Sequence, residues 1–118
     1  MSLNVKKQVE TFTRKIDIAI PPEKPVITGF IEVDYFIKSK PEVKELSDLN
    51  LTDEEYLPRI ASNIRGLGGE KPEDAITGDA AFVEVLTGKY SMYLVPAIVT
   101  DYFEQYGQAR RGNSRTRR

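Results

Sequence analysis

The sequence contains no cysteine, no histidine and no tryptophan among its 118 residues. The absence of cysteine excludes disulfides, thiol catalysis and thiolate zinc sites, and the absence of histidine excludes the triads and metal clusters that need an imidazole. A metal site would have to consist of carboxylates alone. No apolar run approaches the ~20 residues of a membrane helix, and the first residues lack the charged and then apolar order of a secretory signal. We therefore expect a cytosolic protein.

The charges divide the chain into an acidic body and a basic end. All 18 acidic residues and 12 of the 17 basic residues precede position 110, so the body has a balance of −6. We predict a flexible N-terminal arm at 1–12, one domain at 13–109, and a disordered basic tail at 110–118. The tail carries five arginines and no acid: Arg110, Arg111, Arg115, Arg117 and Arg118.

Two segments near the start of the chain have the period of a β-strand. From Thr13 to position 20, isoleucines alternate with polar or small residues, which predicts a strand with one buried face. The sequence PPEKP at 21–25 then interrupts the pattern, because proline cannot donate a hydrogen bond to a neighbouring strand. A second strand is predicted over 26–38, and we interpret Gly29 as the mark of a β-bulge.

Three shorter helical segments are predicted after the strands. The first covers 41–50 and opens with proline, as helices often do. The second covers 52–64 and begins with the capping-box sequence TDEE. Within it, Pro58 predicts either a kink or a short turn before a helix that starts at the proline. The third covers 80–86, with Asp79 as its cap.

The longest helical pattern is the sequence SMYLVPAIVTDYFEQY at 91–106, whose apolar residues form one stripe. A helix of this length spans roughly 24 Å and can serve as the platform on which the other elements pack. We expect Pro96 in its first turn, where proline costs little, or after a short preceding turn. Gly107 is expected to end the helix.

Two strands followed by four helical segments indicate an α+β fold. We expect a small antiparallel sheet, formed by an N-terminal hairpin, with the helices packed on one face. A lone hairpin is marginally stable in water. A third strand from the N-terminal arm, or pairing with another subunit, would stabilise the hairpin. Self-association is therefore one of the alternatives.

The acidic clusters and the glycine-rich segment do not form catalytic or metal-binding motifs. Asp53, Glu54 and Glu55 are consecutive residues at a predicted helix start, where capping accounts for them better than acid–base chemistry. The glycines of GLGGE lack the phosphate-loop pattern GxxxxGK[ST], and the acids between 70 and 79 lack the spacing of a calcium loop. The sequence therefore predicts no enzyme, no cofactor and no metal site.

The motifs follow one another in an order that resembles a known family. They are KIDIAIPPEKP, TGFIEVDYF, TDEEYL, IRGLGGE and AIVTDYFEQYGQARRGN, and the resemblance extends over most of the chain from about Thr11 to Asn113. The ending, with Gly107, Arg110, Gly112 and Asn113, is the most suggestive piece. This arrangement resembles the tail assembly chaperones of long-tailed bacteriophages.

The resemblance implies a non-enzymatic protein of the phage or prophage tail. Such a protein coats the tape measure protein in the host cytoplasm, keeps it soluble and presents it to polymerising tail tube subunits. It is absent from the mature virion. The resemblance also implies a longer form made by ribosomal frameshifting near the end of the reading frame.

A chaperone of this kind needs an exposed apolar surface of its own. Our hypothesis is a partner-binding surface between Phe30 and Phe36, on the mixed face of the second strand, and Tyr102 and Tyr106 of the last helix. The same tyrosines also fit an ordinary core face. As an alternative function, the arginine tail can make the chain a small nucleic-acid-binding or regulatory protein. We expect nucleic acid to be the lesser partner, because the body is acidic and the tail has no aromatic residue for stacking on bases.

Overall fold

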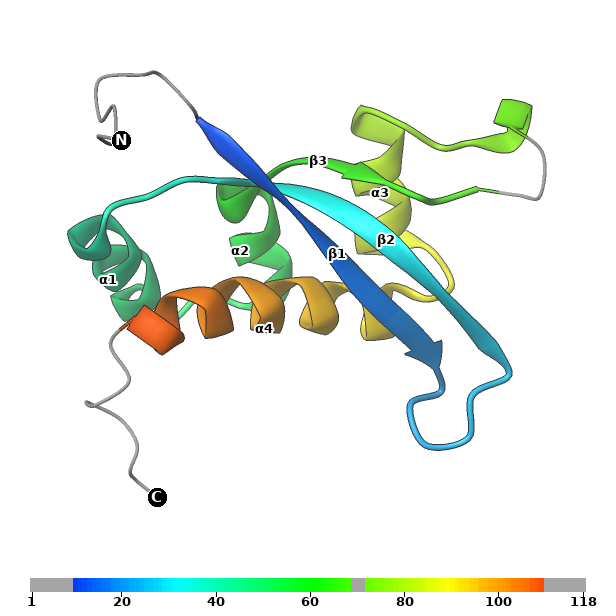
Figure 1. Ribbon diagram of the computed structural model, residues 1–118, viewed down its shortest axis with the longest axis horizontal. Helices are drawn as coiled ribbons and strands as arrows, with labels where there is room; N and C mark the ends of the chain where they lie inside the picture. Colours follow the sequence, from blue (N-terminus) through cyan, green and yellow to red (C-terminus); the bar gives the residue numbers. More distant parts are fainter. Residues whose placement is uncertain (1–9, 69–71, 110–118) are drawn as a thin grey trace, which may run out of the picture.

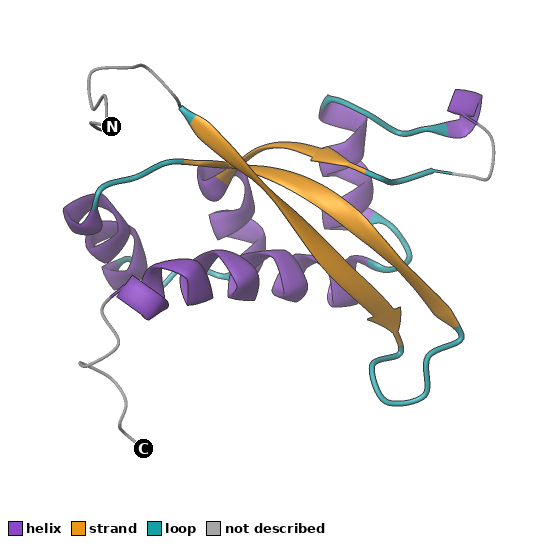
Figure 2. Cartoon of the chain, viewed as in Figure 1, coloured by secondary structure: helices purple, strands orange, loops and turns teal. Residues whose placement is uncertain are grey.

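The computed structural model describes residues 10–68 and 72–109 of the chain (Figures 1 and 2). It confirms an α+β fold in which an N-terminal hairpin opens a three-stranded antiparallel sheet. The strands are β1 (Thr11–Ile20), β2 (Ile27–Phe36) and β3 (Ala61–Arg65). The helices are α1 (Lys40–Asp48), α2 (Asp53–Ile60), the short 3-10 helix η1 (Pro72–Asp74), α3 (Asp79–Thr87) and α4 (Ser91–Ala109).

The sheet has the order β1-β2-β3, and one of its faces carries the hydrophobic core. The β1–β2 register is unbroken from Thr11 opposite Phe36 to Ile20 opposite Ile27. Because side chains alternate along a strand, the odd-numbered residues of β2 from Ile31 onward are buried, whereas the even-numbered ones are partly exposed. Helices α2, α3 and α4 pack against the buried face (Figure 1).

The third strand corrects the prediction of a helix continuing to Ile64. In the β2–β3 register, Val33 lies opposite Ile64 and Tyr35 opposite Ala61, so Ser62 is an extra residue at a β-bulge. The bulge turns both Ala61 and Ile64 toward the core although they are three residues apart. Three is also the spacing of a helical stripe, which is why the sequence pattern predicts a helix here.

Two further strand predictions need correction. Gly29 does not mark a bulge, since it lies opposite Ile18 in the regular β1–β2 register. The arm predicted at 1–12 is too long, because Thr11 and Phe12 already belong to β1. Residues 1–9 lie outside the described residues, as does the predicted tail at 110–118.

The capping box that starts α2 is confirmed. The Glu55 amide donates to Thr52 Oγ1 at 3.2 Å, and the Thr52 amide donates to Glu55 Oε1 at 3.0 Å. Helix α2 therefore starts before Pro58, which lies inside it rather than at its beginning. The sequence reading missed a second capping box, formed by Ser39 and Glu42 at the start of α1.

The two C-terminal helices start and end differently from prediction. Asp79 is the first residue of α3 and not its cap, because Gly78 takes the cap position. In α4, Pro96 lies beyond the first turn, so the amide hydrogen bond to the carbonyl of Met92 is missing. Pro96 and Met92 are both exposed, which places this interruption on the solvent side of the helix. Gly107 does not end α4, which continues to Ala109.

Three polar contacts join the sheet to α4. The hydroxyl of Tyr35, a fully buried residue of β2, donates to the backbone carbonyl of Ile98 at 2.8 Å. The guanidinium of Arg14 in β1 donates to both carboxylate oxygens of Asp101, at 2.7 and 3.2 Å. Burial raises the pKa of Tyr35 above its ordinary value, and the negative charge of Asp101 raises it further. Tyr35 therefore stays a neutral hydrogen-bond donor.

We predict that Tyr35→Phe destabilises the protein by about 1–2 kcal/mol, because it removes a buried hydrogen bond without changing the shape of the side chain. Urea unfolding followed by circular dichroism measures this change. Tyr93→Phe is the matched control, since Tyr93 is partly exposed, and it should change the free energy of unfolding by less than about 0.5 kcal/mol. Equal effects of the two variants would contradict the role assigned to the Tyr35 hydroxyl.

Candidate functional site

The face of the sheet opposite the core, which we call the outer face, carries side chains from all three strands. In the part of the chain that the structure describes, no helix covers this face (Figure 1). Its side chains come from the odd-numbered positions of β1, the even-numbered positions of β2 and the second half of β3. Among the residues of the outer face are Thr13, Lys15, Asp17, Phe30, Glu32, Asp34, Phe36 and Arg65.

An ion pair that links the three strands occupies the middle of the outer face. Asp34 accepts two hydrogen bonds from the Arg65 guanidinium, one of them at 2.9 Å, and a third from the hydroxyl of Thr13. Glu32 lies 3.8 Å from Arg65 on the same face. The hydrogen bonds from Arg65 lower the pKa of Asp34 below its ordinary value, against the opposing effect of partial burial. The centre of this face is therefore polar and internally paired.

Phe30 and Phe36 lie on the outer face, on either side of that ion pair. Phe30 is 50% exposed, and the Lys15 ammonium lies 4.3 Å from the centroid of its ring. Phe36 is half-buried, with the Lys38 ammonium 5.7 Å from its ring centroid. The two phenylalanines share a face, as predicted, but charged side chains separate them.

Tyr102 does not contribute to a surface with these phenylalanines. It is fully buried in the core, where its ring lies 5.1 Å from that of Tyr35. Even-numbered residues of β2 point away from α4, so the sheet itself separates Phe30 and Phe36 from Tyr102. The hypothesis of one surface between the strand and the helix is therefore wrong, and the core interpretation of Tyr102 is correct. Tyr106 belongs to α4, but its side chain is not described, and the five tail arginines lie outside the described residues.

Three exposed apolar side chains lie at the end of the β1–β2 hairpin, which extends past the helices (Figure 1). Four others are exposed elsewhere on the described chain, namely Ile37, Leu49, Val83 and Met92. We call residues 20–30 the hairpin arm. Val26 is 84% exposed, Ile27 42% and Phe30 50%. The alternation of the strand places Ile27 and Phe30 on opposite faces. The arm thus presents apolar groups on both sides, a feature that the sequence reading missed because Val26 was assigned only as the first residue of a strand.

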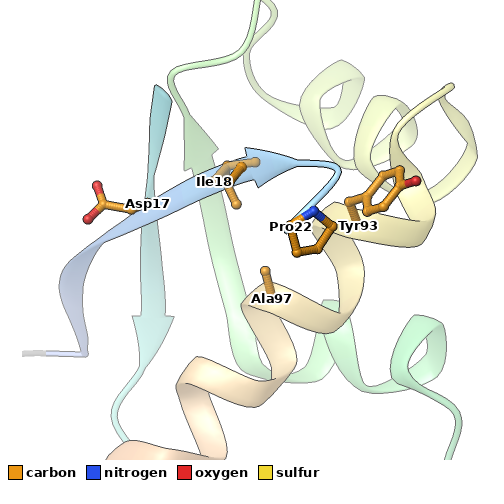
Figure 3. A pocket seen from close by; sticks show the side chains of 6 residues that line it. Asp17, Ile18, Pro22, Tyr93 and Ala97 are labelled. Carbon is orange, nitrogen blue, oxygen red and sulfur yellow. The ribbon is translucent and has the colours of Figure 1, made fainter. Parts of the chain in front are cut away.

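A pocket of about 280 Å³ lies between the base of the hairpin arm and the first turns of α4. Ile18 and Pro22 face it from the hairpin, and Tyr93 and Ala97 face it from the helix, whereas the carboxylate of Asp17 points away (Figure 3). The lining is therefore mostly apolar. Such a pocket can accept an apolar side chain from a partner.

No group of three or more acidic side chains within residues 10–68 and 72–109 is arranged to hold a metal ion. No single helix in those ranges is long and apolar enough to cross a membrane. Helices α3 and α4, which bend by 111° at their junction, pass that test only as a pair.

Comparisons with protein-family models, with curated proteins and with solved structures gave no match to this chain. The resemblance to tail assembly chaperones therefore rests on the sequence motifs.

The Asp34–Arg65 pair predicts a specific dependence of stability on pH. The pKa of Asp34 is lower in the folded chain than the ~3.9 of an unfolded aspartate, so the pair stabilises the fold above about pH 4 and loses this effect as the pH falls further. Because Arg65 is partly exposed, we expect Asp34→Asn to cost only about 0.5–1 kcal/mol near neutral pH.

Urea unfolding of the native chain and of the Asp34→Asn variant, each near pH 7 and near pH 2.5, measures the difference between their free energies of unfolding. This difference should shrink in acid. Asp48→Asn is the control, because Asp48 meets Lys44 in an exposed pair within one helix and should change stability little at either pH. A deficit of the Asp34 variant that is the same at both pH values would show that its ionisation is not involved.

Proposed function

We propose that this chain is a non-enzymatic tail assembly chaperone of a long-tailed phage or prophage, which binds the tape measure protein and helps to recruit tail tube subunits. The order of the sequence motifs between residue 15 and residue 113 supports this function. The protein acts in the host cytoplasm and leaves the tail before it is complete.

The exposed hairpin arm is the observation that carries the proposal. A tape measure protein is a long helix whose apolar stripes aggregate unless another surface covers them. Val26, Ile27 and Phe30 offer apolar contact area at the end of a hairpin that extends past its own helices. A projecting arm of this kind can lie along a helix and bury part of its stripe.

The pocket beside the arm extends the proposed contact. Its apolar lining from Ile18, Pro22 and Tyr93 lies next to the arm (Figure 3), so one side chain of the bound helix can enter it while neighbouring ones contact the arm. Apolar walls of this kind support binding rather than acid–base chemistry. Phe30 therefore belongs to the proposed binding surface, whereas Phe36 and Tyr102 do not.

We predict that the double variant Val26→Ser and Phe30→Ser recovers at least about tenfold less tape measure protein than the native chain, because two buried apolar side chains are lost from the complex. The measurement is an affinity pull-down of the tagged full chain, co-expressed with the neighbouring genes, and mass spectrometry quantifies the bound tape measure protein. Val83→Ser is the matched control, since Val83 is 58% exposed on α3, away from the arm.

Treatment of half of each lysate with nuclease separates the two functions. A long, helix-rich protein bound in both halves supports the chaperone, and its loss in the arm variant alone supports the proposed surface. Partners bound only without nuclease would favour the nucleic-acid-binding alternative, in which case deletion of residues 110–118 abolishes their recovery and binding weakens steeply with salt. Full binding by the arm variant would refute the assignment of the surface.

A further inference from the structure

The sheet has a long strand at one edge with no neighbour in the described chain. The strand order places β1 at an edge, and none of residues 10–68 or 72–109 pairs with its outer side (Figure 1). β1 is ten residues long. An unpaired edge of this length presents a row of backbone donors and acceptors, which is a template for another strand.

Two hydrogen bonds establish which residues of β1 point toward that free edge. The amide of Ile37 donates to the carbonyl of Glu10 at 2.8 Å, and the amide of Val26 donates to the carbonyl of Ile20 at 3.0 Å. The even-numbered residues therefore direct their backbone groups toward β2. Because backbone groups alternate in direction along a strand and the register has no bulge, the odd-numbered residues from Thr11 to Ala19 direct theirs outward.

We propose that a second copy of this chain occupies the free edge, with the two β1 strands antiparallel and the two-fold axis at Ile16. Because the outward backbone groups belong to odd-numbered residues, odd-numbered residues must lie opposite odd-numbered ones in the pair of strands. The two-fold axis must therefore lie at one residue position and not between two neighbouring positions. With the axis at Ile16, Lys15 lies opposite Asp17 of the second copy, and Asp17 lies opposite its Lys15. Each dimer then has two opposite-charge pairs on the outer face.

The neighbouring registers lack these pairs. An axis at Lys15 places the two lysines opposite each other, and an axis at Asp17 places the two aspartates opposite each other, and like charges in such positions are unfavourable. An axis two residues away from Ile16 leaves Lys15 opposite Thr13 or Pro21, with no charge pair. The charge pattern of the strand thus selects one register.

The side chains on the core face are compatible with this register. Ile16 of one copy lies beside Ile16 of the other, which extends the core across the axis. Arg14 is a charged residue that points inward on an edge strand, a device that usually discourages edge pairing. Here its guanidinium is held by Asp101 at 2.7 Å, so the charge is directed to α4 and only the aliphatic stem lies beside the partner strand.

The pairing joins the two sheets into one sheet of six strands. Since β1 runs toward the hairpin arm and the partner strand runs the opposite way, the two arms lie at opposite ends of the joined sheet. Both arms stay exposed. The inference does not depend on the proposed function, and it concerns other residues than those that contact the tape measure protein.

Charge reversal tests both the dimer and its register. Sedimentation equilibrium of the full chain should give about twice the mass of 13.4 kDa. Lys15→Asp and Asp17→Lys, made separately, each place like charges opposite each other and should raise the dimer dissociation constant roughly tenfold or more. An equimolar mixture of the two variants restores both opposite-charge pairs and should again sediment as a dimer.

The mixture separates the interface from an effect on folding, because a chain that fails to fold cannot be rescued by another variant. Thermal unfolding of each variant, followed by circular dichroism, should remain cooperative. A native chain that stays at 13.4 kDa up to ~1 mM, where even a millimolar dissociation constant is visible, would overturn the proposal. The proposal would also be overturned if either single charge reversal left the dimer intact, or if the mixture of the two variants stayed monomeric.

Discussion

The attachment of α4 to the inner face of the sheet is the constraint on which the rest of the structure depends. Tyr35 and Tyr102 meet in the core, and the Tyr35 hydroxyl bonds to the helix backbone. Arg14 and Asp101 form an ion pair between β1 and the same helix. Apolar packing supplies most of the stability of such a contact, whereas these polar bonds, which need particular donor and acceptor positions, determine where along the sheet the helix lies.

Because α4 and its neighbours cover one face, every strand residue is assigned to one of two environments. The inner face is apolar apart from Arg14, and the outer face carries charges that are paired across strands, with Asp34 and Arg65 at the centre. Among the described residues, no helix forms a second layer over this outer face. The separation of the two faces explains why Phe30 and Phe36, on the outer face, cannot cooperate with aromatic residues of the helix.

The two surfaces that we propose for contact with partners lie where the helices stop covering the sheet. The hairpin arm extends past them and exposes Val26, Ile27 and Phe30. The outer side of β1 has backbone groups beside which none of the described residues forms a strand. The two features differ in chemistry, since one is apolar and the other consists of backbone groups flanked by Lys15 and Asp17. We therefore propose different occupants for them, a helical partner for the arm and a second copy of the chain for the edge.

The sequence by itself determined the local elements, because their causes are local. Alternation at positions 13–20, the capping box of Thr52 and Glu55, and the apolar stripe of α4 each involve residues close together in the chain, and each is confirmed. Only the tertiary structure decided that residues 61–65 form a strand, since β2 supplies the partner and the bulge hides the period of two. It alone placed Tyr102 in the core and exposed the hairpin arm, because burial depends on which distant elements pack together.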